Sequence, residues 1–497
     1  MVIGLLSMII VTPLLTSFPA VYGIYSVCIS LTIFLSYADI GFLGAGLKYA
    51  SESYSQGNLH EEIKIIGFTI FILSVFVLMF SFSALFLSFN PDLLITKLEN
   101  SAERDIASRL LLILSLFSPL IILQRCLQLI FGIRLEDYVF QRILMIPSAI
   151  KILSVLYFFQ ANRYDIVGYY LFSQIITVAT IVYCFLLAKK KYNYDIGLLF
   201  RSIRFNRDVL NKTKTIAFNS LYVTVLWVFF FEIDSVIIIR YLGPLEAAYY
   251  AVGFTILSFF RSILSIIYGP FQTRFNHFIG NNNIGELNKF FENVIVRTIP
   301  IVVIPILTFV LLADHVIIAW VGMRYEKSII VAQLLSIGYM FTFITQPTSI
   351  YLTAIEKIKP IYFIITAMLL IYWGGVFLTI NSLGLLSFPL SKLIAFIVSA
   401  LCYGVYALKN TGLNIMSIAK GIAFPIIATI LILIIVDTMV PLPIDKSKVH
   451  LLIFVSLGGF CTVVGILLYY FTSKDFRNYI DSKIDFKKML VSIGNRF

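Results

Sequence analysis

Long apolar stretches separated by short polar segments run along the whole chain of 497 residues. Crossing the hydrocarbon core of a bilayer takes an α-helix of ~20 mainly apolar residues, whereas strands of a membrane barrel are about half as long. A helix also satisfies its own backbone hydrogen bonds in lipid. We therefore predict an all-α polytopic membrane protein with about 14 transmembrane helices. The predicted spans are residues 2–17, 21–47, 63–90, 110–133, 143–160, 164–188, 215–240, 247–271, 290–312, 329–352, 360–380, 384–407, 418–437 and 450–472.

The overall composition agrees with lipid as the main solvent of these side chains. The chain is 60% hydrophobic and 13% charged, with a mean hydropathy of +0.95. That is too little charge to cover a water-soluble protein of this size. The formal net charge is +12. In a membrane protein such an excess of cations reflects the orientation of the loops rather than nucleic-acid binding, and it suits contact with anionic membrane lipids.

Lysine and arginine are distributed unevenly between alternate loops. One set of loops, together with the C-terminal tail, holds 24 of these residues, and the opposite set holds 8. Cations concentrate on the cytoplasmic side of membrane proteins, so we expect the first set in the cytoplasm. With an even number of spans, both termini lie there too. Residues 2–17 lack the basic leader and the cleavage site of a signal peptide, so they are predicted to form the first helix.

A basic segment, residues 189–214, divides the chain after six predicted spans. It is predicted to be a cytoplasmic linker with an interfacial amphipathic part. The predicted organisation is a six-helix lobe at 1–188, the linker at 189–214, a second six-helix lobe at 215–408, two extra transmembrane helices at 409–472 and a basic cytoplasmic tail at 473–497.

An internal repeat links the two predicted lobes. A shift of 225 residues places Pro19 on Pro244 and keeps its register for more than 40 residues. Further matches are Tyr25 with Tyr250, Val27 with Val252, Gly44 with Gly269, Asn58 with Asn283, Glu61 with Glu286 and Lys64 with Lys289. Because each lobe has six spans, both lobes enter the membrane from the same side. Such a parallel repeat is common in alternating-access transporters.

Metal and enzyme chemistry find no support in the sequence. The five cysteines stand singly in apolar segments, and the four histidines form no ligand cluster. There is no nucleotide-binding loop, no nucleophile elbow and no paired acidic motif of a glycosyltransferase. We expect neither a metal nor a cofactor, and we predict that the protein is not an enzyme.

A few charged residues lie inside the predicted spans, and they are the candidate substrate-binding residues. Each costs roughly 2.5–3.5 kcal/mol at a helix centre on insertion scales, so each must face protein, water or a partner. They are Asp39, Arg125, Lys151, Glu232, Asp234, Arg261 and Lys392.

Two of these charges lie on polar stripes at helical spacing. Arg261 shares a face with Thr255, Ser258, Ser262, Ser265 and Gly269, and Asp39 shares one with Tyr25, Thr32 and Ser36. The repeat places Ser36 on Arg261, so the two stripes are predicted to face each other across a cleft between the lobes. Asp39 then either neutralises a cation, takes up a proton or a sodium ion, or serves as a structural ion-pair partner.

The remaining candidates carry weaker signals. Arg125 is flanked by Gln124 and Gln128, which fits an interior polar patch and a helix-packing contact equally well. Lys151 and Lys392 are single lysines in apolar spans. The glycines at 41, 44 and 46 are predicted to permit close contact between helices.

Two stretches carry a resemblance to a known family. They are VYGIYSVCISLTIFLSYADIGFLGAGLKYASESYSQGN (residues 21–58) and FFEIDSVIIIRYLGPLEAAYYAV (residues 230–252). With the span count and the break after the sixth span, they resemble Wzx-type O-antigen and polysaccharide flippases. This family belongs to the multidrug/oligosaccharidyl-lipid/polysaccharide exporter superfamily, with MATE-type multidrug exporters and lipid II flippases. The N-terminus here is shorter than the family pattern.

The resemblance implies a function. Such flippases move undecaprenyl-pyrophosphate-linked oligosaccharide units, the repeats of lipopolysaccharide O-antigen, from the cytoplasmic to the periplasmic leaflet of the bacterial inner membrane. The expected mechanism is alternating access of two six-helix lobes around a central cavity, with coupling to protons or sodium ions. Expected partners are the lipid-linked substrate, membrane lipids, an O-antigen polymerase and a chain-length regulator. The alternative is a cation-coupled exporter of small amphipathic compounds of the MATE type.

Overall fold

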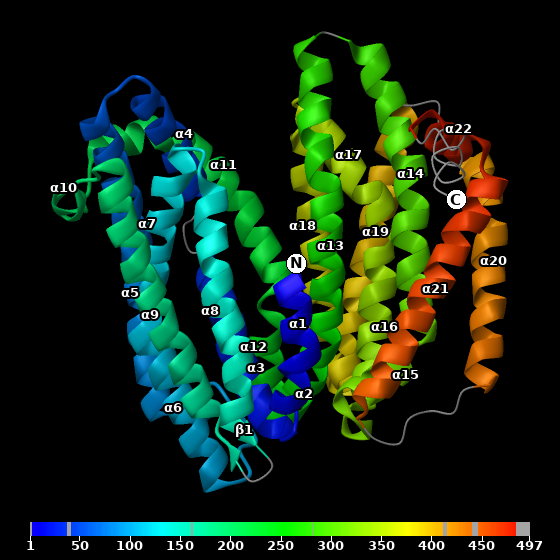
Figure 1. Cartoon of the computed structure of the whole chain (residues 1–497), viewed down its shortest axis with the longest axis horizontal. Helices are drawn as coiled ribbons and strands as arrows, with labels where there is room; N and C mark the ends of the chain where they lie inside the picture. Colours follow the sequence, from blue (N-terminus) through cyan, green and yellow to red (C-terminus); the bar gives the residue numbers. More distant parts are fainter. Residues whose placement is uncertain are drawn as a thin grey trace, which may run out of the picture. The chain divides into compact units, whose positions relative to one another are not determined.

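The computed structural model describes residues 2–36, 41–160, 163–281, 283–410, 415–439 and 446–483. Apart from one hairpin, these residues form helices and the turns between them (Figure 1). The hairpin pairs β1 (Phe159–Gln160) with β2 (Arg163–Tyr164) in antiparallel register. The prediction of an all-α polytopic membrane protein is therefore confirmed.

The chain forms two compact units, Met1–Ala251 and Val252–Phe497. The helices that begin in the first unit are α1 (Val2–Ile10), α2 (Thr12–Leu15), α3 (Pro19–Ser36), α4 (Phe42–Ser55), α5 (Leu59–Phe89), η1 (Pro91–Leu93), α6 (Ser101–Phe117), α7 (Leu120–Ile133), α8 (Asp137–Phe158), α9 (Ile166–Tyr192), α10 (Ile196–Arg201), α11 (Arg207–Phe231), α12 (Asp234–Tyr241) and α13 (Pro244–Gly280).

Helix α13 continues into the second unit. The helices that follow it there are α14 (Ile284–Leu311), α15 (Ala313–Val321), η2 (Met323–Tyr325), α16 (Lys327–Met340), α17 (Thr342–Ala354), α18 (Lys359–Leu383), η3 (Gly384–Leu386), α19 (Ser387–Asn410), α20 (Ile415–Met439), α21 (Lys448–Thr472) and α22 (Lys474–Lys483). The units divide beyond the predicted linker because α11 and α12 pack against α4 and α3 in the first unit. The predicted lobe boundaries stay a prediction.

Each predicted span coincides with one or two apolar helices. Eight helical stretches in the described residues are long and apolar enough to cross a membrane, and ten are if each bent pair counts as one span. One stretch, Lys359–Lys409, contains two predicted spans. Three further predicted spans correspond to the shorter apolar helices Gly4–Leu15, Pro19–Leu35 and Ile422–Ile435.

Large apolar side chains are exposed in rows along the outer helices. On α5 the row is Met79, Phe82, Phe86 and Phe89, and on α18 it is Phe363, Leu370 and Phe377. Spacings of three, four and seven residues keep each row on one helix face. Apolar surface of this extent is stable only against lipid, so these rows are the faces that contact the bilayer.

The loops of the first unit sort to its two ends, as the predicted spans require. At one end, Arg134 after α7 meets Glu62 at the start of α5, and Lys191 at the end of α9 meets Glu136. These residues belong to loops predicted on the cytoplasmic side. At the other end, the Thr96 hydroxyl donates to the Arg240 carbonyl at 2.9 Å. The alternation of loops within this unit therefore agrees with the predicted spans.

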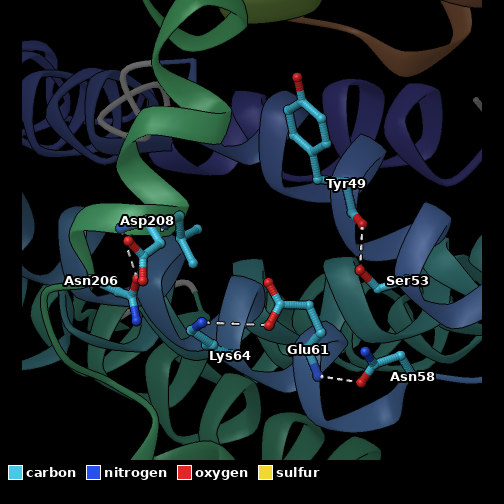
Figure 2. A network of polar contacts seen from close by, with 8 residues as sticks. Tyr49, Ser53, Asn58, Glu61, Lys64, Asn206 and Asp208 are labelled. Atoms are coloured by element: carbon cyan, nitrogen blue, oxygen red, sulfur yellow. Dashed lines mark hydrogen bonds and ion pairs between the residues drawn. The ribbon is translucent and has the colours of Figure 1, made fainter.

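Asparagine caps begin several of these helices on the same side. The Asn58 side chain accepts a hydrogen bond from the Glu61 amide at 3.0 Å and starts α5. Asn206 likewise accepts from the Asp208 amide at 3.1 Å and starts α11. Figure 2 shows both caps and the ion pair of Glu61 with Lys64. Such caps satisfy backbone donors that the first helical turn leaves free.

Candidate functional site

Lys151 lies in the middle of α8 and faces a polar cavity inside the first unit. The cavity has a volume of about 270 Å³ and lies between α3, α6, α7, α8 and α9. The Lys151 ammonium donates a hydrogen bond to Thr177 Oγ1 of α9 at 3.0 Å. A lysine at this depth must face polar groups, and α3, α7 and α9, together with Ser118 after α6, provide them. The polar side chains of the lining are Tyr25, Thr32, Ser118, Gln124, Tyr169, Tyr170, Ser173, Gln174 and Thr177.

Part of the predicted stripe on the second span lines this same cavity. Thr32 donates to the Cys28 carbonyl at 2.9 Å and lies 3.5 Å from the Tyr170 hydroxyl. The rings of Tyr25 and Tyr170 meet edge to face, with 5.7 Å between their centroids. The structure thus brings the lysine candidate together with the stripe of α3, which the sequence did not connect.

Asp39, the carboxylate of that stripe, lies outside the described residues. The glycine that follows, Gly41, is described and has a φ of +74° at the start of α4. An added Cβ at Gly41 would lie 2.4 Å from the Ala217 carbonyl oxygen of α11, and one at Gly46 would lie 2.5 Å from Thr69 Oγ1 of α5. Among the residues that the structure describes, none lies within 4 Å of a Cβ placed at Gly44. Close helix contact is therefore found at 41 and 46, and not at 44.

Arg125 lies on α7 and is half-buried. Its guanidinium donates to the Gln128 side-chain oxygen at 2.6 Å, one helical turn further along. Its other neighbour in the sequence, Gln124, lines the cavity around Lys151. Arg125 is therefore paired within α7, while Gln124 lies at the lysine cavity, and the choice between an interior polar patch and a helix-packing contact stays a prediction.

Glu232 and Asp234 lie at the break between α11 and α12 in the first unit. Their exposed fractions are 7% and 1%. The Tyr250 hydroxyl, in the first turns of α13, donates to Asp234 Oδ2. A charge-assisted hydrogen bond of this kind compensates part of the cost of a buried carboxylate. Both acids are therefore buried, and the hydrogen bond of Asp234 to Tyr250 lies within the first unit.

Lys392 lies on α19 in the second unit and is fully buried. Its ammonium lies 4.8 Å from the centroid of the Tyr372 ring on α18 and 5.7 Å from that of Phe254 on α13. Aromatic faces attract a desolvated cation with about 2 kcal/mol or more. The ammonium of Lys392 is therefore held in the interior of the second unit.

Arg261 lies at the middle of the predicted polar stripe on α13. Thr255 and Ser258 on the stripe are half-buried, and Arg261 is half-buried too, whereas Ser262 and Ser265 are exposed. The hydroxyl of Ser262 donates to the Ser258 carbonyl at 2.9 Å. Polar, open surface on an otherwise apolar membrane helix does not suit lipid. The stripe is thus a partly exposed polar face of α13.

The sequence missed a buried ion pair at the end of the first unit where α5 begins and α7 ends. Arg134 makes two parallel hydrogen bonds to Glu62, at 2.9 and 3.3 Å. The side chains are 5% and 0% exposed. The guanidinium also lies over three tyrosine rings, at 4.7 to 5.2 Å from their centroids. These rings are Tyr54, Tyr192 and Tyr194.

A second contact continues this network at the surface. Lys191 and Tyr192 both donate hydrogen bonds to Glu136. These two bonds hold the pKa of the Glu136 carboxyl below its usual range, and the bond from Lys191 has the larger effect. Nothing in the local sequence marks either contact, because the partners come from loops far apart in the chain. The network joins three loops and is a structural anchor of this end of the unit.

The described candidates therefore fall into separate groups. Lys151 lines a cavity of the first unit together with Gln124, the sequence neighbour of Arg125, and Glu232 and Asp234 lie elsewhere in that unit. Lys392 and Arg261 belong to the second unit. Chemically, the groups can bind anions and hydroxyl-rich molecules. The described residues contain no cluster of three or more metal-ligating side chains.

Comparison with known proteins rests on structure. No protein-family model matches this sequence, and no curated protein matches it. The structure is similar to a lipid II flippase, MurJ, in an inward closed conformation, with a TM-score of 0.71, 16% identity, and coverage of 94% of this chain and 96% of that one. It is also similar to an inward-facing MATE multidrug transporter of the MOP superfamily, with a TM-score of 0.64, 14% identity, and coverage of 82% and 93%. The chain therefore has the multi-pass helical fold of these transporters.

Proposed function

We propose that this protein is a flippase for undecaprenyl-pyrophosphate-linked oligosaccharides, such as the repeat units of O-antigen. It moves them from the cytoplasmic to the periplasmic leaflet of the bacterial inner membrane by alternating access of two lobes. In this proposal the protein is a transporter rather than an enzyme, both termini are cytoplasmic, and a proton or sodium gradient supplies the energy.

The observation that carries the proposal is the sign of the charges within the spans. Four of the six described candidates are cations, namely Arg125, Lys151, Arg261 and Lys392. Arg261 stands on the open polar stripe of α13, where a passing headgroup would meet it. A guanidinium offers a planar set of donors that matches phosphate oxygens. A cargo with a pyrophosphate fits such a path better than a cationic drug does.

The extent of the fold similarity supports the same conclusion. The lipid II flippase covers 94% of this chain, whereas the MATE transporter covers 82%. Lipid II is the cargo in the name of the similar protein, whereas the cargo proposed for this chain is inferred from the charges of its own residues. The fold similarity supports the transport mechanism.

One observation favours the second candidate, a cation-coupled exporter of the MATE type. Glu232 and Asp234 are buried close together in the first unit, and buried membrane carboxylates are typical of sites that take up protons or cations. The same pair also serves a flippase that is driven by an ion gradient. The distinction therefore depends on the cargo.

A strain that lacks this gene tests the proposal. Lipid-linked repeat units should accumulate, and mass spectrometry of extracted lipids measures them. In right-side-out vesicles an impermeant oxidant should leave these glycans intact, because they remain on the cytoplasmic leaflet. A plasmid with the wild-type gene should restore surface polysaccharide. Normal polysaccharide together with a raised sensitivity to amphipathic cations would instead identify a drug exporter.

A further inference from the structure

We propose that the cavity around Lys151 is a binding site for a sugar that carries a negative charge, a carboxylate or a phosphate. The inference rests on the proposed function, because it takes the cargo to be a lipid-linked glycan. It goes further by assigning one subsite inside the first unit and by requiring an acidic sugar in the cargo.

The charge of the site comes from a lysine with unused donors. An ammonium has three N–H donors. Among the residues that the structure describes, the hydrogen bond of Lys151 goes to Thr177, and no carboxylate lies within ion-pair distance. Thr177 donates its own hydroxyl hydrogen to the Ser173 carbonyl at 2.9 Å, so its oxygen is oriented to accept. The remaining donors of the ammonium are available to an oxyanion.

A purely structural lysine would be arranged differently. The buried cation Arg134 of the same unit has its carboxylate, Glu62, at 2.9 Å. Lys151 instead lines three adjoining cavities, of about 270, 390 and 180 Å³. Its position at their common wall keeps the ammonium beside open space. This contrast within one unit favours a ligand site at Lys151.

The walls around the lysine suit a hydroxyl-rich ligand. Gln124 and Gln174 supply amides that both donate and accept hydrogen bonds, and Ser118 and Thr32 supply hydroxyls. Sugar hydroxyls also donate and accept, so mixed groups of this kind satisfy them from several directions. A drug-like amphipathic molecule would offer the amides of Gln124 and Gln174 apolar surface in place of hydrogen-bonding groups, which is costly in a low dielectric.

Aromatic rings complete the wall on the side of α3 and α9. Tyr25, Tyr169 and Tyr170 line the cavity, and each combines an apolar ring with a polar hydroxyl. A sugar ring has the matching character, with an apolar C–H face and polar edges. The volume of the cavity is close to the lower limit for ligand pockets, which is about 300 Å³. It therefore suits one ring rather than a whole repeat unit.

The test is binding of soluble probes to the purified full-length protein. Saturation-transfer NMR measures the dissociation constants of D-glucuronate, D-glucose, D-glucose 1-phosphate and inorganic phosphate. We expect glucuronate, glucose 1-phosphate or both to bind at least about tenfold more tightly than glucose, because charge-assisted hydrogen bonds exceed neutral ones. Which of the two binds better identifies the source of the charge. Equal binding of all three sugars would overturn the proposal.

Variants connect this preference to the cavity. Lys151→Gln should reduce the affinity for the acidic sugars to that for glucose, whereas Lys151→Arg should keep a preference for the acidic sugars. The matched control is Lys190→Gln at the exposed end of α9, which should bind as the wild type does. If Lys151→Gln fails to fold, Gln174→Leu is tested in its place, and this variant should lower the affinity for every sugar. An unchanged preference in a folded Lys151→Gln, or unchanged binding by Gln174→Leu, would overturn the proposal.

Inorganic phosphate separates a sugar site from a simple anion site. We expect phosphate to compete with the acidic sugars only weakly, since it lacks the ring. Phosphate that binds as tightly as they do would contradict the sugar assignment. The binding assay involves no transport, so it can succeed while the deletion strain shows normal export. In that case the proposed function fails and the subsite stands.

Discussion

Asn58 and Asn283 make the same capping contact in the two halves of the chain. Each side chain accepts a hydrogen bond from the backbone amide of the glutamate three residues later, at 3.0 Å for Glu61 and 3.2 Å for Glu286. Each glutamate also pairs with the lysine three residues beyond it, at 3.5 and 3.9 Å. The residues that the repeat aligns therefore build the same helix start.

The helix boundaries extend this correspondence. Helix α3 begins at Pro19 and α13 at Pro244, while α5 begins at Leu59 and α14 at Ile284. Both pairs keep the shift of 225 residues that the sequence shows. The capped starts of α5 and α14 lie one in each unit. This correspondence supports a duplicated ancestral lobe.

The first prediction concerns the buried ion pair of Glu62 with Arg134. Glu62→Gln leaves the guanidinium of Arg134 buried without its anion, which should lower the free energy of unfolding by about 3–5 kcal/mol. Thermal unfolding of the purified protein, with size-exclusion chromatography as the readout of the folded fraction, measures this loss of stability. The neighbouring variant Glu61→Gln removes only a half-exposed pair and should cost about 0–1 kcal/mol. Equal losses in the two variants would show that the buried pair has no special role.

The second prediction compares two glycines at the start of α4. Gly41→Ala places a Cβ on a backbone with φ of +74° and 2.4 Å from the Ala217 carbonyl oxygen. We expect it to cost about 1–3 kcal/mol and to reduce the amount of folded protein in the membrane. Gly44→Ala meets no neighbour within 4 Å and should be tolerated. The yield of monodisperse protein distinguishes them, and a normal yield for Gly41→Ala would contradict the tight approach of α4 to α11.

The third prediction concerns the cargo contact of Arg261. Arg261→Ala should abolish surface polysaccharide while the protein still inserts, because the stripe loses its cation. Arg261→Lys should keep part of the function, since charge remains but the planar pair of donors is lost. Immunoblots of membranes and of surface polysaccharide give both readouts. Normal export by the alanine variant would remove Arg261 from the mechanism.

The fourth prediction concerns Asp39, the carboxylate outside the described residues. If Asp39 takes up a coupling ion, Asp39→Asn should reach normal abundance but export poorly, and this is the result we expect. If it only balances a buried cation, the same variant should be scarce, because an unpaired charge destabilises the fold. Quantifying protein and polysaccharide in one culture separates the two roles. Wild-type export at normal abundance would exclude both.

The fifth prediction concerns orientation across the membrane. A reporter fused after a residue of a cation-rich loop should give a cytoplasmic signal, and one fused after a residue of the opposite loops should give a periplasmic signal. The reason is that cations concentrate in cytoplasmic loops. The expected inside positions are Asn58, Arg204 and Lys483, and the expected outside positions are Asn100, Glu326 and Lys446. A cytoplasmic signal at Glu326 would contradict the arrangement of about 14 spans.

The sequence by itself determined the helical membrane fold, the approximate spans and the repeat. Lipid cannot pair with backbone groups, so every crossing needs a long apolar helix, and that requirement is visible in composition alone. The match of Asn58 with Asn283 was likewise visible, and the structure shows that both are N-caps, which depend on residues within one turn. Local interactions of this kind do not depend on how the helices are packed.

The tertiary structure decided which polar residues meet. Lys151 shares a cavity with Thr32 and Gln124 because α3, α7 and α8 pack around it, and the spacing of these residues in the chain contains no sign of that. The pair of Glu62 and Arg134 joins positions 72 residues apart. Contacts between distant segments depend on how the helices pack around one another, which a single sequence does not reveal, so the sequence identified the charged candidates but only packing assigned their partners.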